Sequence, residues 1–235
     1  MNAVTLGNVS FDYVLVGATS IAKCTQRHAI AVMRCLAADV VDKANSGHPG
    51  MPISMSPVAY VLWKYFINVD PEKPQWLNRD RFVLSNGHGY DLLYMVLHLA
   101  GFKVSLEDLM NFRQVDSITP GHPEFYQTPG VDATTGSLGQ GFANSVGMAM
   151  AQEHVAARAN TDKIVVSDNY TYAFCSDGDL TEGVALEAMA QAGHHKLGKL
   201  IVIYDDNKIT IDGSTDVAIT EDIYKVAEGY HWHVQ

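Results

Sequence analysis

Two polar residues about thirty positions apart, Asp177 and Asn207, carry the clearest chemistry in the sequence. An Asp carboxylate, an Asn amide oxygen and backbone carbonyls are ligands that Mg²⁺ or Ca²⁺ prefers, and Mg²⁺ usually completes its shell with phosphate oxygens. The pair therefore indicates a hard cation that bridges the protein to a bound diphosphate. For the dipeptide Asp177-Gly178 taken alone, a simple turn after a strand is an open alternative.

The elements that must position this pair form a βαβ unit. The pattern predicts a strand over residues 172–175, an acidic turn over 176–179, a helix over 181–192 and a second strand over 200–204. Strands joined by such a crossover are parallel neighbours, so their carboxyl ends meet at one edge of the sheet. We therefore expect Asp177 and Asn207 to lie close together at the edge where α/β proteins bind ligands.

Three histidines lie on predicted loops, where side chains are more often functional than in a packed helix. His48 lies in SGHPG, between helix breakers, and His122 lies in the proline-containing loop 114–135. His88 follows a predicted strand over 81–84 and should share the sheet edge of Asp177. Imidazoles titrate near neutral pH, so these residues suit proton transfer.

A glycine-rich turn, Gly136-Ser137-Leu138-Gly139, would let the backbone approach a ligand closely. Helices are predicted elsewhere from apolar periodicity and from start and stop signals. They are 20–44 (ended by Gly47), one beginning at Ser56-Pro57 and closed by Pro71, 90–101, 105–112, and one from about Gly139.

Composition sets the broad class of protein. The 235 residues suit one α/β domain, and 26 acidic against 16 basic residues give a net charge of −10, which opposes a large nucleic-acid interface. The three cysteines lack metal-site spacing and indicate free thiols in a reducing compartment, so we expect a cytoplasmic protein. No apolar run reaches the roughly 18 residues of a membrane span, and no membrane association is expected.

Six motifs occur in the order and spacing of the N-terminal, diphosphate-binding domain of transketolases: SGHPG, LSNGHG, TPGHPEF, TTGSLGQG, SDGDLTEG and YDDNKITIDG. The resemblance covers roughly residues 25–235. It implies a parallel sheet flanked by helices that binds thiamine diphosphate through a divalent metal, Mg²⁺ or Ca²⁺. The metal ligands that it implies are Asp177, Asn207 and the backbone carbonyl of Ile209.

The resemblance also implies roles for the other motif residues. The histidines matching His48, His88 and His122 line the substrate channel, and His88 also approaches the diphosphate. Contacts to the cofactor are implied for Gly136, Ser137, Leu138 and Gly178, and a contact across a dimer interface for Glu182. The sequence departs from the family at Ser176 and Ser54, where Gly is usual, and at Ser137, where Pro is usual.

The resemblance further implies a transferase that moves a two-carbon ketol unit between sugar phosphates, in the pentose phosphate pathway. We expect an N-terminal arm over residues 1–19 and a domain over 20–235 that is incomplete at its C-terminal end. The family's pyrimidine-binding domain is not among these residues, so a homodimer or a chain that supplies this domain is the expected partner.

Other readings of the motifs stay open. A dihydroxyacetone synthase or a split transketolase subunit would carry the same motifs, and a non-catalytic cofactor-binding or dimerisation module would also keep them. A zinc hydrolase is a distant alternative, because the pair His231 and His233 has no third ligand nearby in the sequence.

Overall fold

The main sheet of the computed structural model, which describes residues 2–5, 20–211 and 213–235, has five strands. Their order is β2-β3-β4-β1-β7, and every neighbouring pair is parallel. The strands are β1 Asn2–Thr5, β2 Arg81–Leu84, β3 Thr171–Ser176, β4 Leu200–Asp205 and β7 His233–Val234. The prediction of an α/β fold built on a parallel sheet is therefore confirmed.

The predicted βαβ unit is formed by β3 and β4, which are direct neighbours with Ser176 opposite Asp205. The connection contains two helices, α6 Asp177–Leu180 and α7 Gly183–His194. The acidic turn is thus itself a short helical turn, and it begins immediately after the last residue of β3.

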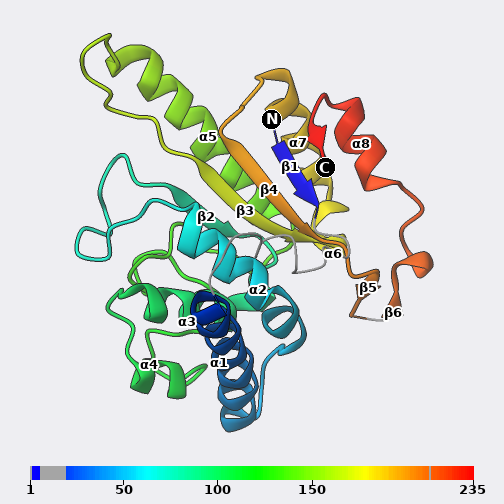
Figure 1. The fold of residues 1–235 in the computed structure, drawn as a ribbon. Coiled ribbons are helices and arrows are strands. Elements are labelled where there is room, and N and C mark those ends of the chain that lie inside the picture. The colour runs from blue at the N-terminus through cyan, green and yellow to red at the C-terminus, as the bar shows by residue number, and fades with distance from the viewer. Residues whose placement is uncertain (1, 6–19, 212) are drawn as a thin grey trace.

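Helices cover both faces of the sheet (Figure 1). Side chains alternate along β2, β3 and β4. One set packs into the core under α1 Ser20–Ala44, α2 Gly50–Tyr65 and α3 Tyr90–Ala100, and the other into the core under α5 Gln140–Ala159, α7 and α8 Ile223–Gly229. In β3, for example, Phe174 belongs to the first core and Cys175 to the second. The remaining elements are η1 Gly87–Gly89, α4 Leu106–Met110, β5 Ile209–Thr210, β6 Gly213–Ser214 and η2 Thr215–Val217.

The predicted start of the second helix was wrong. The helix α2 begins at Gly50 and contains Pro57 in its interior. Proline has no amide to donate to the carbonyl four residues earlier, which here belongs to Ile53. The Nε of Arg34 on α1 donates to that carbonyl at 3.0 Å, and the Ser56 hydroxyl donates to Pro52 O at 2.5 Å. A neighbouring helix therefore supplies the missing donor, and the Ser-Pro pair does not begin the helix.

The first helix spans 20–44 as predicted, but Asn45 rather than Gly47 ends it, with a left-handed φ of 49°. Residues 1 and 6–19 of the predicted N-terminal arm lie outside the described residues. Residues 2–5 form β1, which pairs with β4 and β7 inside the sheet. Among the described residues, no helix is both long enough and apolar enough to cross a membrane.

Candidate active site

The carboxyl ends of β3 and β4 bring Asp177 and the Asn207 turn together. Asp177 is 3 % exposed, and its Oδ2 accepts a hydrogen bond of 3.0 Å from the backbone amide of Lys208. Its Oδ1 accepts a hydrogen bond of 2.5 Å from the hydroxyl of Tyr204, at the end of β4. The carboxylate is thus held in one orientation by donors from the neighbouring strand and the turn that follows it.

Asn207 is exposed beside this carboxylate. Its Oδ1 accepts from the Ile209 amide at 3.1 Å, and its Nδ2 donates to Asp205 at 3.1 Å. One buried carboxylate, one amide oxygen and the carbonyls of an exposed turn share this edge, and this donor set fits a single hard cation that also binds phosphate. Within residues 2–5, 20–211 and 213–235, no three His, Cys, Asp or Glu side chains form a metal-binding group.

Close backbone contacts connect the glycine turn to both sides of the site. A Cβ on Gly87 would lie 2.8 Å from the amide nitrogen of Gly136. A Cβ on Gly136, whose φ is 152°, would lie 3.3 Å from the His122 ring. A Cβ on Gly178 would lie 3.6 Å from Leu138. The turn therefore forms a continuous path from the histidine loops to Asp177, with Ser137 exposed.

The carboxyl of Asp179 holds the glycine turn in place through hydrogen bonds, a role that the sequence analysis missed. Its buried Oδ1 accepts hydrogen bonds from the Gly139 amide at 2.7 Å and from the Ser85 hydroxyl at 2.9 Å. The Ser85 oxygen in turn accepts from the Phe142 amide at 2.7 Å, near the start of α5. Burial raises the pKa of Asp179, and burial followed by the Asp179 charge raises the pKa of the neighbouring Cys175 thiol.

Two of the three predicted histidines, His48 and His122, lie against one buried tyrosine, Tyr90, at the start of α3, and His88 lies against His48. The rings of His48 and His88 are 5.6 Å apart, and Tyr90 lies 6.1 Å from His48 and 5.5 Å from His122. The guanidinium of Arg113 lies over the Tyr90 ring at 5.7 Å. The sequence analysis missed Tyr90 and Arg113, because only the folded loop brings Arg113 back to α3.

Burial lowers the pKa of each of the three histidines. For His48, which is exposed overall but partly desolvated at its ring, and for His122, the charge of Arg113 adds to the lowering. For His88 the other two histidines add to it. All three rings are therefore neutral at pH 7, and a neutral imidazole can both donate and accept a hydrogen bond.

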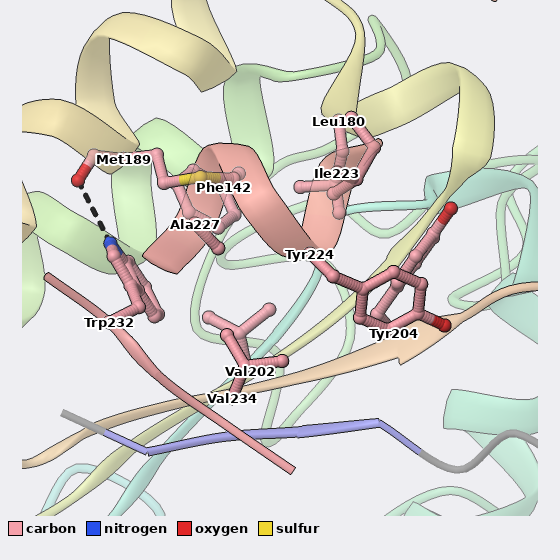
Figure 2. Close-up of a pocket in the computed structure, with 10 residues that line it drawn as sticks. All are labelled: Phe142, Leu180, Met189, Val202, Tyr204, Ile223, Tyr224, Ala227, Trp232 and Val234. Atoms are coloured by element: carbon pink, nitrogen blue, oxygen red, sulfur yellow. Dashed lines mark hydrogen bonds between the residues drawn. The ribbon is translucent and has the colours of Figure 1, made fainter. Parts of the chain in front are cut away.

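A small apolar cavity of about 30 Å³ lies beneath the site, between α8 and β4 (Figure 2). Its lining includes Tyr204, whose ring faces the cavity, and Trp232, whose Nε1 donates to Met189 O at 3.0 Å. The cavity is too small and too apolar to hold a diphosphate, so it is a packing feature behind the Asp177 edge.

Comparison with known proteins agrees with this geometry. The profile of one family, described as "Transketolase, thiamine diphosphate binding domain", matches residues 25–235. The chain belongs to the transketolase family. It is 58 % identical over 206 residues to transketolase 1 of Saccharomyces cerevisiae, covering 88 % of this chain and 30 % of the relative.

Solved transketolase structures have the same fold. The enzyme from Leishmania mexicana superposes with a TM-score of 0.87 at 50 % identity, covering 88 % of this chain and 31 % of that one. A Pichia stipitis transketolase in complex with sedoheptulose-7-phosphate gives a TM-score of 0.87 at 51 % identity, with the same coverage. The chain thus spans about a third of the length of the transketolases that it matches.

Glu182 stands apart from the other residues that the transketolase motifs single out. It is the exposed N-cap residue of α7, and its Cβ would be 2.7 Å from a Cβ on Gly139. The first carbons of its side chain therefore lie against Gly139, while the residue as a whole is exposed. Ile209 lies in the β5-β6 hairpin and is 59 % exposed.

Proposed function

We propose that this chain binds thiamine diphosphate through Mg²⁺ or Ca²⁺ and supplies the diphosphate-binding part of a transketolase active site. The observation that carries the proposal is the hydrogen bond between Asp177 and the Lys208 amide, which joins the two motif turns at the carboxyl edge of the sheet. Asp177, Asn207 and the Ile209 carbonyl would hold the metal, and Gly136, Ser137, Leu138 and the Gly178 amide would contact the cofactor.

The proposed reaction is transfer of a two-carbon ketol unit from a ketose phosphate to an aldose phosphate. Thiamine diphosphate, when bound, supplies the carbanion equivalent that this transfer needs. His48, His88 and His122 would bind the hydroxyls of the sugar and move protons between them, because their neutral rings can act as donor or acceptor. The relative crystallised with sedoheptulose-7-phosphate supports sugar phosphates as substrates.

The proposal includes a partner, because the pyrimidine-binding part of the cofactor site lies outside these 235 residues. We propose that the exposed side chain of Glu182 contacts that domain, supplied across a homodimer or by a second chain. The two cysteines with described side chains, Cys35 and Cys175, are free thiols, which supports the cytoplasm as the compartment.

Isothermal titration of the chain with thiamine diphosphate, with and without Mg²⁺, tests the proposed binding site. We expect saturable binding that requires Mg²⁺, and its loss in Asp177→Ala, because the metal would lose its carboxylate ligand. The matched control is Asp168→Ala, which removes an exposed carboxyl that pairs with Lys199 ahead of β3, at the opposite edge of the sheet. Equal affinity in Asp177→Ala and in the unmodified chain would contradict the metal site.

Complementation tests the proposed reaction. A separately produced pyrimidine-binding half of a transketolase, added to this chain and cofactor, should restore transfer from a ketose phosphate to an aldose phosphate. Turnover only with formaldehyde as acceptor would identify a dihydroxyacetone synthase instead. Cofactor binding without any turnover in the complemented sample would identify a non-catalytic module.

A further inference from the structure

The hydroxyl of Tyr90 contacts both a pure donor and a histidine of the proposed substrate channel. Arg113 Nη1 is 3.3 Å from this oxygen, and His48 Nδ1 is 3.1 Å from it. A guanidinium can only donate hydrogen bonds, so it must occupy a lone pair of the Tyr90 oxygen.

The two partners of this oxygen determine where the hydroxyl proton goes. The hydroxyl proton cannot point toward the guanidinium, and within the described residues His48 Nδ1 is the only other group in hydrogen-bond contact with this buried oxygen. The O–H must therefore donate to His48 Nδ1, which then carries no proton. In a neutral ring, the proton is consequently on Nε2.

The scaffold that holds this arrangement is rigid. Tyr90 is 0 % exposed, and its ring packs against Phe112 at a centroid distance of 5.0 Å. Arg113 follows Phe112 directly and adopts a left-handed φ of 59°, and its backbone amide donates to Thr119 O at 3.0 Å. The strained backbone turns the guanidinium back over the Tyr90 ring. Arg113 therefore stays the donor to the Tyr90 oxygen, and that oxygen stays the acceptor.

We propose that Tyr90 and Arg113 are positioning residues that fix His48 in the Nε2–H tautomer, so that His48 presents a proton donor to an oxygen of the bound substrate. The consequence for substrate rests on the proposed function, whereas the tautomer itself does not. A ligand that offers a hydroxyl or carbonyl lone pair at this position is favoured over one that offers only a proton.

Nitrogen-15 NMR of the histidine side chains tests the proposal in the free chain, without cofactor or substrate. The signals of His48 are assigned by their loss in His48→Gln. At pH 7.5 we expect a pyridine-type Nδ1 and a pyrrole-type Nε2 for His48. A pyrrole-type Nδ1 would overturn the proposal, and this result is independent of whether thiamine diphosphate binds.

Two variants separate the effect of the Tyr90 hydroxyl on His48 from general effects on packing. Tyr90→Phe keeps the ring but removes the hydroxyl, and we expect the His48 signals to shift toward a mixture of the two tautomers. Tyr94→Phe is the matched control, one turn later on α3, where the lost hydroxyl bonds to Pro120 O at 2.9 Å. An unchanged His48 spectrum in Tyr90→Phe, or an equal shift in Tyr94→Phe, would contradict the assignment.

Substitution of Arg113 provides a test that leaves Tyr90 in place. In Arg113→Met the hydroxyl proton of Tyr90 can turn toward the position of the lost guanidinium, so the Nδ1–H tautomer of His48 should become populated. Arg113→Lys retains a donor and should restore part of the Nε2–H population. Identical His48 signals in the Met, Lys and unmodified chains would show that Arg113 does not set the tautomer, even if Tyr90→Phe failed to fold.

Discussion

Asp91 lies in the first turn of α3, where a carboxylate usually stabilises a helix by facing its free amides. Here the side chain is only 1 % exposed, and within the described part of the chain neither carboxyl oxygen has a hydrogen-bond partner. Burial raises the pKa of Asp91 to about 8, so the carboxyl is protonated in the folded protein at neutral pH.

This burial predicts an unusual dependence of stability on pH. Between the unfolded pKa near 3.8 and the folded pKa near 8, the folded state binds the extra proton, so Asp91 makes stability fall as pH rises. A full proton difference corresponds to roughly 1.4 kcal/mol per pH unit. Asp91→Asn removes this term, and urea unfolding at pH 5.5 and 8 should show a smaller loss of stability in the variant.

The comparison of the two slopes is the informative measurement, because other titrating groups contribute to both proteins. Identical changes in the free energy of unfolding between the two pH values would show that Asp91 is already ionised in the folded chain.

At the scale of elements, three separate segments meet at the Asp179 carboxyl. Ser85 follows β2, Gly139 precedes α5, and Asp179 lies in α6 after β3. These are the segments that contain three of the six family motifs. The carboxyl therefore fixes the relative positions of the turns on which the proposed cofactor site depends.

Replacement of this carboxyl should distinguish its acceptor role from its charge. Asp179→Leu leaves the Gly139 amide and the Ser85 hydroxyl without their acceptor, and we expect a loss of about 2–4 kcal/mol in the free energy of unfolding. Asp179→Asn keeps an acceptor oxygen and should cost less than half as much. Denaturant unfolding measures both, and equal losses would mean that the charge, rather than the two hydrogen bonds, matters.

The elements also show which features the sequence could predict. The βαβ unit, the capped helix α4 and the loop positions of the histidines follow from local patterns, and the structure contains them. The start of α2 does not follow from a local pattern, because the donor that replaces the missing amide of Pro57 comes from Arg34 on another helix. The same reason applies to Asp179, Tyr90 and Arg113, whose partners are distant in sequence and meet only in the folded chain.

At the scale of the whole molecule, the C-terminal segment is docked on α7 by a close backbone contact. A Cβ on Gly193 would lie 1.8 Å from the Tyr230 carbonyl oxygen, just after α8. Trp232 then packs 6.0 Å from Phe142 and bonds to Met189. The segment that closes the second core thus depends on the absence of a side chain at Gly193.

A pair of Gly→Ala substitutions tests this docking. Gly193→Ala should displace the segment and lower stability by about 1–3 kcal/mol. Gly147→Ala on α5 meets no atom within 4 Å and should raise stability by up to about 1 kcal/mol, because Ala favours the helix. Thermal unfolding of both variants is the measurement, and changes of the same sign would contradict the contact.

The alternation of side chains between the two cores has a consequence for how such a gene can change in length. One codon gained or lost near the start of β3 would turn each later side chain of the strand to the other face, so Phe174 and Cys175 would exchange cores. The segment 161–165, ahead of β3, is exposed at every residue and places no side chain in either core. Insertions and deletions should therefore accumulate there among descendants of this gene, while the strand keeps its length.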